Sequence, residues 1–478
     1  MAAHHLALYG LRVLYRQKVL TMNINYRQTI DDGPISRMQW AVVVLATSVL
    51  FLDGMDFQIA AFAAPLIMRE WHLTKPMFAP LLAAALVGMA FGSLIGSWAG
   101  DKFGRRPTII FSVAFFGLLT ILCAFVTSPV AFGVLRFLGG LGLGSALPVA
   151  LATISEWMPS RVSGKAISIS TLGIPAGIII GAVLASRLLV PFGWRHFFVI
   201  VGSICVVASA LLAWRLPESP AYLVVKGRYQ EVHRLLISAW KKTVGDGVAP
   251  FEHSVPPVGQ GELFTKRNTR ANTGLWLSSM CAGLVTYGIA GWLIVALTDM
   301  KVPLATALRG SITYSTSAIV GTLVVGWLLA RWGSRLTMIA LAVLAFVMAL
   351  SIAASIYLVG LTGAGYAIIF LGLAGLGFGL SGVLAANYVV AANIYPTAIR
   401  ARGIGITSAV SRIGAILSSF VGSAMLVIGG GPAFFTMVAG FVALIAIGAL
   451  VINRHLAARR RATLSGMGDK NWERLHSL

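Results

Sequence analysis

The chain has 478 residues, of which 58% are hydrophobic and only 11% are charged, and its formal net charge is +22. This balance excludes an ordinary soluble protein and is typical of one that crosses a membrane many times. The basic residues form short clusters between apolar stretches, as the positive-inside rule predicts, so the charge does not indicate nucleic-acid binding.

The first 37 residues are polar and basic and contain no apolar stretch long enough for a signal peptide. We expect residues 1–37 to form a cytoplasmic N-terminal tail. Met1 and Met22 are both candidates for the start of the chain, because nothing that follows needs residues 1–21.

The first predicted span carries two aspartates, Asp53 and Asp56, in a stretch that is otherwise uncharged over residues 40–68. About 20 apolar residues suffice to cross the roughly 30 Å hydrocarbon layer. Aspartates three residues apart share a helix face. Because an intramembrane carboxylate is costly, it indicates a proton or ion pathway. The alternative is a pair that faces a wet cavity or is neutralised by an arginine for packing alone.

The apolar stretches that follow predict five more spans, which would complete an N-terminal six-helix bundle over residues 38–216. These spans are expected at 76–100, at two places within 107–155, and at 166–186 and 197–214. Cys123, Cys205 and Cys281 lie in apolar segments without metal or disulfide spacing, and we interpret them as small core residues.

A polar stretch then interrupts the pattern and predicts a cytoplasmic central loop at residues 217–270, of which 219–242 could form a surface helix. Six further spans fit a second bundle at 271–453, and 454–478 is a basic cytoplasmic tail. Most of the 37 lysines and arginines then lie on the cytoplasmic side, so we expect both termini there. The predicted fold class is an all-α membrane protein with twelve transmembrane helices in two pseudo-symmetric bundles.

The two halves also contain similar segments in the same order. The segment around Gly104 is similar to the one around Gly333, and the one that begins at Arg161 is similar to the one that begins at Arg400. Each pair would lie at the cytoplasmic ends of equivalent helices. This order predicts a duplicated six-helix unit.

Several motifs resemble those of the major facilitator superfamily and, within it, of the aromatic acid:proton symporter family. The resemblance covers about residues 28–455, and its most specific piece is the Asp-Gly-Met-Asp sequence of the first span. The motifs are Asp53-Gly-Met-Asp56, Asp101-Lys-Phe-Gly-Arg-Arg106, Arg136-Phe-Leu-Gly-Gly140, Ser155-Glu-Trp-Met-Pro159 and Pro217-Glu-Ser-Pro220. The chain departs from the superfamily at Ser97, where a glycine is usual, and at Ala330, which replaces the acidic residue in the second half.

The resemblance implies a charged cytoplasmic gate that holds one state of the transporter together. Because Ala330 removes the equivalent acid from the second half, the gate is expected to be asymmetric. The expected gate residues are Asp101, Arg105, Arg106, Glu156, Arg161 and Arg400.

Two intramembrane arginines are candidates for binding an anion. Arg136 lies at a depth comparable to that of Asp53 and Asp56, and its planar fork matches a carboxylate. Its alternative role is a permanent structural pair with the aspartates. Arg412 lies near the middle of the predicted eleventh span, in the other half, where a substrate between the repeats could reach it. Its alternative role is snorkelling or helix pairing.

Polar and aromatic side chains of the second half complete the candidate site. Asn387 and Tyr388 are predicted to contact substrate, and Tyr287, Trp292 and Tyr314 could contact an aromatic ring and its hydroxyl. Each of these residues alone could equally serve packing or face lipid.

The sequence therefore predicts a proton-coupled secondary transporter that imports a small organic anion, with an aromatic carboxylate as the leading interpretation. Asp53 and Asp56 would couple protons. The absence of a Gly-Pro-X-X-Gly-Gly sequence in residues 173–181 favours import over a proton-driven exporter of drugs or metabolites, which is the alternative. A membrane-embedded enzyme or sensor is less consistent, since no nucleophile–base pair or metal cluster appears. We expect no catalytic residue, and no cofactor, metal or nucleic acid as a partner. The expected protein is a monomer that crosses the inner (plasma) membrane many times. Its expected partners are a small organic acid, protons and lipid.

Overall fold

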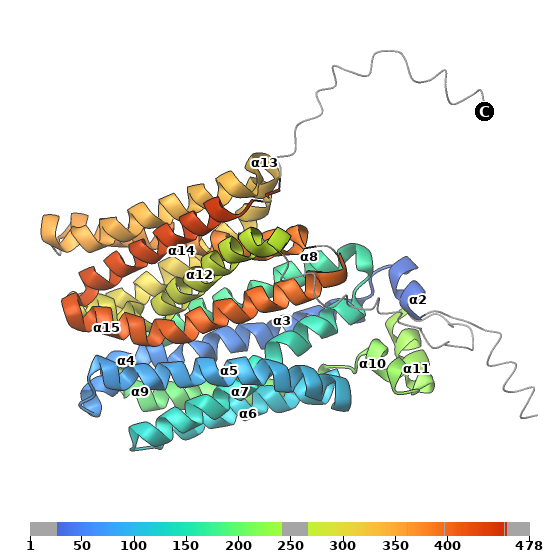
Figure 1. Cartoon of the computed structure of the whole chain (residues 1–478). Coiled ribbons are helices and arrows are strands. Elements are labelled where there is room, and N and C mark those ends of the chain that lie inside the picture. The colour runs from blue at the N-terminus through green and yellow to red at the C-terminus, as the bar shows by residue number, and fades with distance from the viewer. Residues whose placement is uncertain (1–25, 241–265, 361, 396, 454, 457–478) are drawn as a thin grey trace, which may run out of the picture.

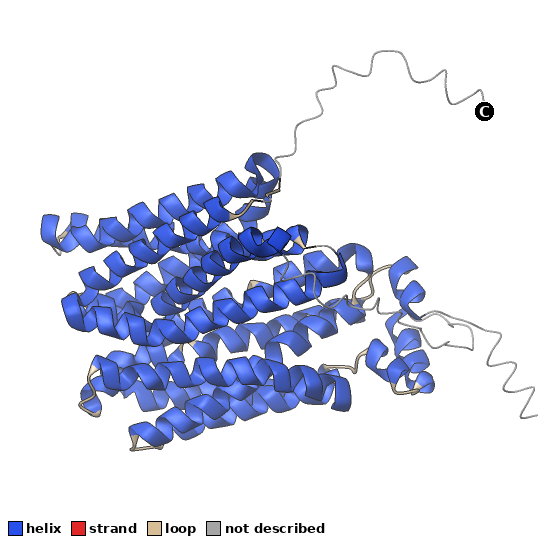
Figure 2. Cartoon of the chain, in the orientation of Figure 1, coloured by secondary structure: helices blue, strands red, loops and turns tan. Residues whose placement is uncertain are grey.

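The computed structural model describes residues 26–240, 266–360, 362–395, 397–453 and 455–456, and the regular structure within these ranges is helical (Figure 2). In chain order the helices are α2 (Tyr26–Asp32), α3 (Arg37–Phe57), α4 (Ile59–Glu70), α5 (Lys75–Phe103), α6 (Arg105–Cys123), α7 (Pro129–Trp157), α8 (Ser160–Thr171), α9 (Gly173–Arg215), α10 (Pro220–Val225), α11 (Tyr229–Trp240), α12 (Lys266–Asp299), α13 (Leu304–Leu358), α14 (Gly363–Ile394) and α15 (Thr397–Val451). Nine helical stretches of the described chain are long and apolar enough to cross a membrane. The predicted all-helical membrane architecture is confirmed at this level.

Three of the nine stretches are more than twice as long as one membrane crossing requires, and each contains a break. The stretches comprise 56, 52 and 50 residues, against the roughly 20 that span a bilayer. The breaks lie at Gly193 in α9, at Gly333 in α13 and at Gly429–Gly430 in α15, where the backbone leaves the helical region. The chain turns at these glycines, because glycine tolerates the backbone angles that a tight turn requires.

The helices lie side by side in one bundle whose two sides correspond to the two parts of the chain (Figure 1). On one side α5 packs on α7 and α6 packs on α9, whereas on the other side α12 packs on α15 and α13 packs on α14. The two sides meet where α4 contacts α12, where α5 contacts α15 and where α9 contacts α13. These junctions place residues far apart in sequence around a common centre.

Glycines allow the closest helix pairs to approach backbone to backbone. A Cβ atom at Gly54 of α3 would lie well under 3.0 Å from a carbonyl oxygen of α9, and one at Gly177 of α9 would meet a carbonyl oxygen of α3 in the same way. Gly283 of α12 and Gly414 of α15 repeat this reciprocal arrangement in the second part of the chain. Small residues permit such close crossings in membrane proteins.

The two segments that the sequence predicts to be equivalent have the same local structure. Gly104 and Gly333 both have positive φ angles, of 116° and 76°. Four residues later, the hydroxyl groups of Thr108 and Thr337 donate to the carbonyl oxygens of these glycines, at 2.7 Å in both cases. The turn before α6 therefore recurs inside α13.

The structure differs from the sequence-based boundaries where helices extend beyond the apolar stretches. The expected tail at 1–37 contains α2, and the expected loop at 217–270 contains the start of α12. The surface helix that the sequence predicts at 219–242 is divided into two helices, α10 and α11. Helices α2, α10 and α11 form a separate apolar cluster, in which Tyr26 and Ile30 of α2 pack with Tyr222, Leu223 and Val232. Met22 and residues 241–265 lie outside the described ranges.

Candidate functional site

A cavity of about 400 Å³ lies between the two sides of the bundle, and Asp53 is in its wall. Phe57 comes from the same helix as Asp53, whereas Tyr287, Tyr314 and Tyr388 come from α12, α13 and α14. Much of the remaining wall is aliphatic. Asp53 is only 2% exposed, and its Oδ1 atom has no hydrogen-bond partner among the described residues. The cavity thus combines a buried carboxylate with several aromatic rings.

Asp56 has different surroundings, although it lies on the same helix as Asp53. It is fully buried, and its carboxylate accepts hydrogen bonds from Thr120 Oγ1 of α6 at 2.5 Å and from Arg136 Nη1 of α7 at 3.4 Å. It is not among the residues that line the large cavity. Residues three apart differ by about 60° around a helix, which suffices for Asp53 to face the cavity and Asp56 to face α6 and α7.

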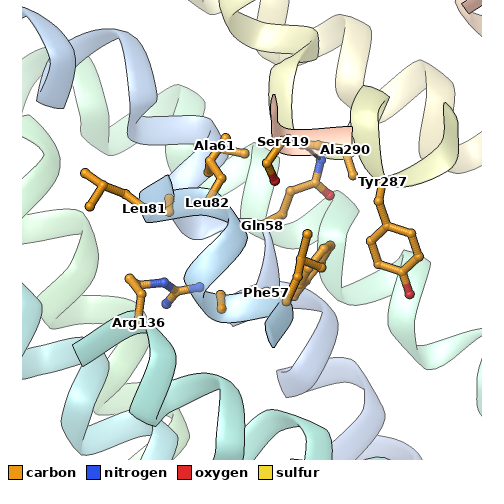
Figure 3. Close-up of a pocket in the computed structure, with 13 residues that line it drawn as sticks. Phe57, Gln58, Ala61, Leu81, Leu82, Arg136, Tyr287, Ala290 and Ser419 are labelled. Carbon is orange, nitrogen blue, oxygen red and sulfur yellow. Dashed lines mark hydrogen bonds between the residues drawn. The ribbon is translucent and has the colours of Figure 1, made fainter. Parts of the chain in front are cut away.

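Arg136 lies beside a smaller chamber of about 30 Å³, close to the junction of α3 and α4 (Figure 3). It is 2% exposed, pairs with Asp56, and does not line the large cavity. Its Nε atom has no hydrogen-bond partner among the described residues. In this conformation its contacts fit the alternative of a structural pair with an aspartate.

Gln58, which the sequence analysis missed, connects the two sides of the bundle. It interrupts the first span between α3 and α4, and its Nε2 atom donates to the carbonyl oxygen of Ala290 in α12 at 3.0 Å. It lines both the chamber and the cavity, and Figure 3 shows its side chain between Phe57 and Ser419. The signal was present in the sequence, because a long amide side chain is also costly within an apolar span.

Arg412 reaches across the bundle from α15 to α5. Its Nη1 atom donates to the carbonyl oxygen of Met89 at 3.0 Å and to Ser93 Oγ at 2.9 Å. Arg412 itself is not among the residues that line the large cavity, whereas Met89 is. Arg412, in contrast to Arg136, thus bonds to a helix of the other side of the bundle, at a residue of the cavity wall.

The predicted contacts of the second half divide into two groups. Tyr388 lines the cavity, as do Tyr287 and Tyr314. Asn387 instead faces α12, where its Oδ1 atom accepts a hydrogen bond from Ser278 Oγ at 3.0 Å. Trp292 is fully buried and donates to a carbonyl oxygen of α15, so it serves packing.

Three of the six expected gate residues, Asp101, Arg105 and Glu156, meet at the end of the bundle that carries α10 and α11. Arg105 binds Asp101 at 2.5 Å and Glu156 at 3.0 Å. The backbone N–H groups of Arg105 and Arg106 both donate to Glu218 Oε1, at 2.9 and 3.2 Å. The sequence analysis did not assign Glu218 to the gate, although it belongs to a quoted motif. Its carboxylate satisfies N–H groups at the start of α6 that lack a partner within the helix.

The remaining gate residues make separate contacts. The guanidinium of Arg106 donates to the carbonyl oxygen of Ala213 at 2.6 Å. Arg161 donates to the carbonyl oxygens of Asp31 and Gly33, at 2.6 and 2.8 Å, and so fixes the chain after α2. The side chain of Arg400 lies outside the described residues.

In the second half, Ser334 and the residues after α15 occupy the place that Arg105 and Glu218 have in the first. Ser334, which follows Gly333 as Arg105 follows Gly104, donates its backbone N–H to the carbonyl oxygen of Leu456 at 3.0 Å. Its hydroxyl group lies 3.0 Å from Nδ1 of His455, whose imidazole pKa is lowered by burial. The turn at Gly333 thus has different partners from the turn at Gly104.

The chain is similar to known proteins both in sequence and in fold. A family model described as the Major Facilitator Superfamily matches residues 46–378. A gallate transporter of Pseudomonas putida is 32% identical, with 92% of this chain and 97% of the relative covered. The 4-hydroxybenzoate transporter PcaK of Acinetobacter baylyi is 27% identical, with 87% and 90% covered. A partially occluded, inward-open structure of the xylose transporter XylE from E. coli has a TM-score of 0.68 at 16% identity, with 88% of this chain and 99% of that chain covered.

Proposed function

The chain belongs to the major facilitator superfamily, and from this premise we propose that it imports a small aromatic carboxylate together with protons by alternating access. It is a multi-pass membrane transporter and not an enzyme. The names of its relatives, a gallate transporter and a 4-hydroxybenzoate transporter, support an aromatic acid as substrate. The sequence similarity extends over most of each relative, so it includes both sides of the bundle.

One observation carries the proposal, namely the buried carboxylate of Asp53 in the wall of a cavity rich in aromatic side chains. The volume of about 400 Å³ lies in the range of small-molecule sites. In our proposal the aromatic rings of Phe57, Tyr287 and Tyr388 contact the substrate ring, and Asp53 gains and loses the coupled proton. Arg412, which bonds to Met89 in the cavity wall, would bind the substrate carboxylate after a change of conformation.

The ion pair of Asp56 with Arg136 has a supporting role in this proposal. Both groups are buried, and they satisfy each other outside the large cavity. When the bundle changes conformation, Arg136 could exchange Asp56 for the substrate carboxylate, which would link binding to protonation. The network around Arg105 would then stabilise one of the two conformations.

We further propose a topology of twelve spans with both termini in the cytoplasm. Division of the three long stretches at Gly193, Gly333 and Gly430 supports the count, and the distribution of lysine and arginine supports the orientation. The two bundles would comprise residues 38–216 and 271–453, and the protein would act as a monomer in the inner membrane. In this orientation the network around Arg105 is cytoplasmic.

The test is uptake by proteoliposomes that contain the purified protein, with an acid-outside pH gradient and radiolabelled gallate or 4-hydroxybenzoate. Wild type should concentrate at least one of these acids. Asp53→Asn should abolish this concentration while exchange of internal for external substrate continues, because exchange needs no net proton movement. Asp32→Asn, which changes an exposed aspartate of α2, serves as the matched control and should behave as wild type.

Two results would contradict the proposal. Normal concentrative uptake by Asp53→Asn would remove Asp53 from proton coupling. Proton-driven movement of the acid in the opposite direction would establish the exporter alternative in place of import.

A further inference from the structure

Two hydroxyl groups in the wall of the large cavity are buried without a hydrogen-bond partner among the described residues. They are Oγ1 of Thr286 on α12 and the phenolic oxygen of Tyr314 on α13. Buried hydroxyl groups are nearly always paired, because an unpaired one loses its bonds to water and gains nothing in return. A pair of such groups at one cavity therefore requires an explanation.

The two hydroxyl groups and Asp53 come from different parts of the chain. Thr286 and Tyr314 belong to the second part of the chain, whereas Asp53 and Gln58, the other lining residues with an unpartnered buried oxygen, belong to the first. A substrate between the two sides would thus meet the carboxyl group of Asp53 on one side and neutral hydroxyl groups on the other.

The chemistry of the second side fits a hydroxyl group of the substrate. A hydroxyl group both donates and accepts, as Thr286 and Tyr314 do, so each can satisfy the other. A second carboxylate fits less well, because the described lining residues from α12, α13 and α14 include no lysine or arginine. The rest of the wall is mainly aliphatic and aromatic, which suits a ring.

We propose that Thr286 and Tyr314 form a subsite for the ring hydroxyl groups of the substrate, so that the protein selects phenolic acids over unsubstituted aromatic acids. This inference rests on the proposed function and specifies its substrate class. Selectivity follows because an acid without a ring hydroxyl would leave both protein hydroxyl groups unpaired in the complex. Sites built in this way discriminate strongly against the analogue that lacks the polar group.

The experiment measures binding of benzoate, 4-hydroxybenzoate and gallate to the purified transporter by calorimetry. Wild type should bind the hydroxylated acids at least about tenfold more tightly than benzoate. Tyr314→Phe and Thr286→Val remove one hydroxyl group each and nearly preserve shape. Each should weaken binding of a hydroxylated acid about tenfold and change benzoate binding less than about twofold.

Tyr395→Phe is the matched control, because it also removes a buried phenol, one that binds Asn272 away from the cavity. It should leave the preference for hydroxylated acids unchanged. If one cavity variant fails to fold, the other variant and the wild-type ligand series still test the subsite.

The outcomes separate this inference from the proposed function. Equal wild-type affinity for benzoate and the hydroxylated acids, or cavity variants that retain the wild-type preference, would overturn the subsite but leave aromatic acid transport intact. Parallel loss of benzoate and phenolic acid binding would also overturn it, since that pattern indicates ring packing. Failure of wild type to bind any aromatic acid would overturn the proposed function, and the subsite with it.

Discussion

At the scale of single residues, Gly54 is as constrained as the two aspartates that flank it. A Cβ atom at this position would collide with the backbone carbonyl of Ile174 on α9, and no side-chain movement can relieve a backbone contact. We expect Gly54→Ala to destabilise the protein by more than about 3 kcal/mol, the upper part of the range for overpacked cores. The measurement is thermal unfolding of the purified protein in detergent.

Gly164→Ala provides the matched comparison, because Gly164 is an exposed helical glycine with no neighbouring atom within 4 Å of the added methyl group. Alanine should stabilise that helix by up to about 1 kcal/mol. A Gly54→Ala protein as stable as wild type would mean that α3 and α9 can separate without cost.

The sequence identifies the site residues whose chemistry is unusual for their surroundings, and it misses the others. Asp53, Asp56 and Arg136 were predictable because a charge within an apolar span is rare. The sequence could not predict that Asp53 lines the cavity whereas Asp56 pairs with Arg136, because the rotation of α3 about its axis depends on how it packs against helices distant in sequence. Thr286 was missed because a threonine in an apolar span is ordinary, and only its burial without a partner marks it.

At the scale of elements, the start of α6 depends more on Glu156 than on Asp101. Asp101 is 73% exposed, whereas Glu156 is 17% exposed and accepts hydrogen bonds from both Arg105 and Ser219. An exposed ion pair contributes about 1 kcal/mol or less. We therefore expect Asp101→Asn to lower stability by at most this amount, and Glu156→Gln to lower it by about 2 kcal/mol or more.

Thermal unfolding of the two variants, together with their uptake rates, would measure this difference. Asp101→Asn is expected to slow transport and leave substrate binding largely intact. A larger loss of stability in Asp101→Asn than in Glu156→Gln would show that the exposed carboxylate organises the network.

The sequence predicts a helix wherever a long apolar stretch marks a membrane span. The expected spans at 76–100 and 197–214 lie within α5 and α9. The start of α12 at Lys266 and the cluster of α2 with α10 and α11 were not predicted, because both lie outside the apolar stretches. Pairing of α2 with α10 depends on residues far apart in sequence, so no local pattern could indicate it.

At the scale of the whole molecule, an ion pair closes one end of the bundle. Lys75 Nζ at the start of α5 lies 2.8 Å from Asp299 Oδ1 at the end of α12, and it also donates to the carbonyl oxygen of Leu426 in α15. Alternating access requires such contacts between the two sides to break and reform. The pair is partly exposed, so its contribution of up to about 1 kcal/mol can shift the two conformations about fivefold.

Lys75→Met should therefore increase the fraction of molecules that are open at this end. Maleimide labelling of a Leu82→Cys reporter in the small chamber should become faster, and the exchanged pair Lys75→Asp with Asp299→Lys should restore the slower rate. Arg228→Met breaks an exposed ion pair at the start of α11, with Glu231, and should leave labelling unchanged. Unchanged labelling in Lys75→Met would show that the Lys75–Asp299 pair does not hold the bundle closed.

The contact of Ser334 with His455 and Leu456 has a practical consequence for anyone who works with this protein. An affinity tag or fluorescent reporter fused after Leu456 keeps the groups that bind Ser334. A fusion point or truncation before His455 removes them, and the turn at Gly333 then loses a contact that Glu218 supplies to its counterpart in the first half. Choice of the fusion point is thus part of keeping the second half folded.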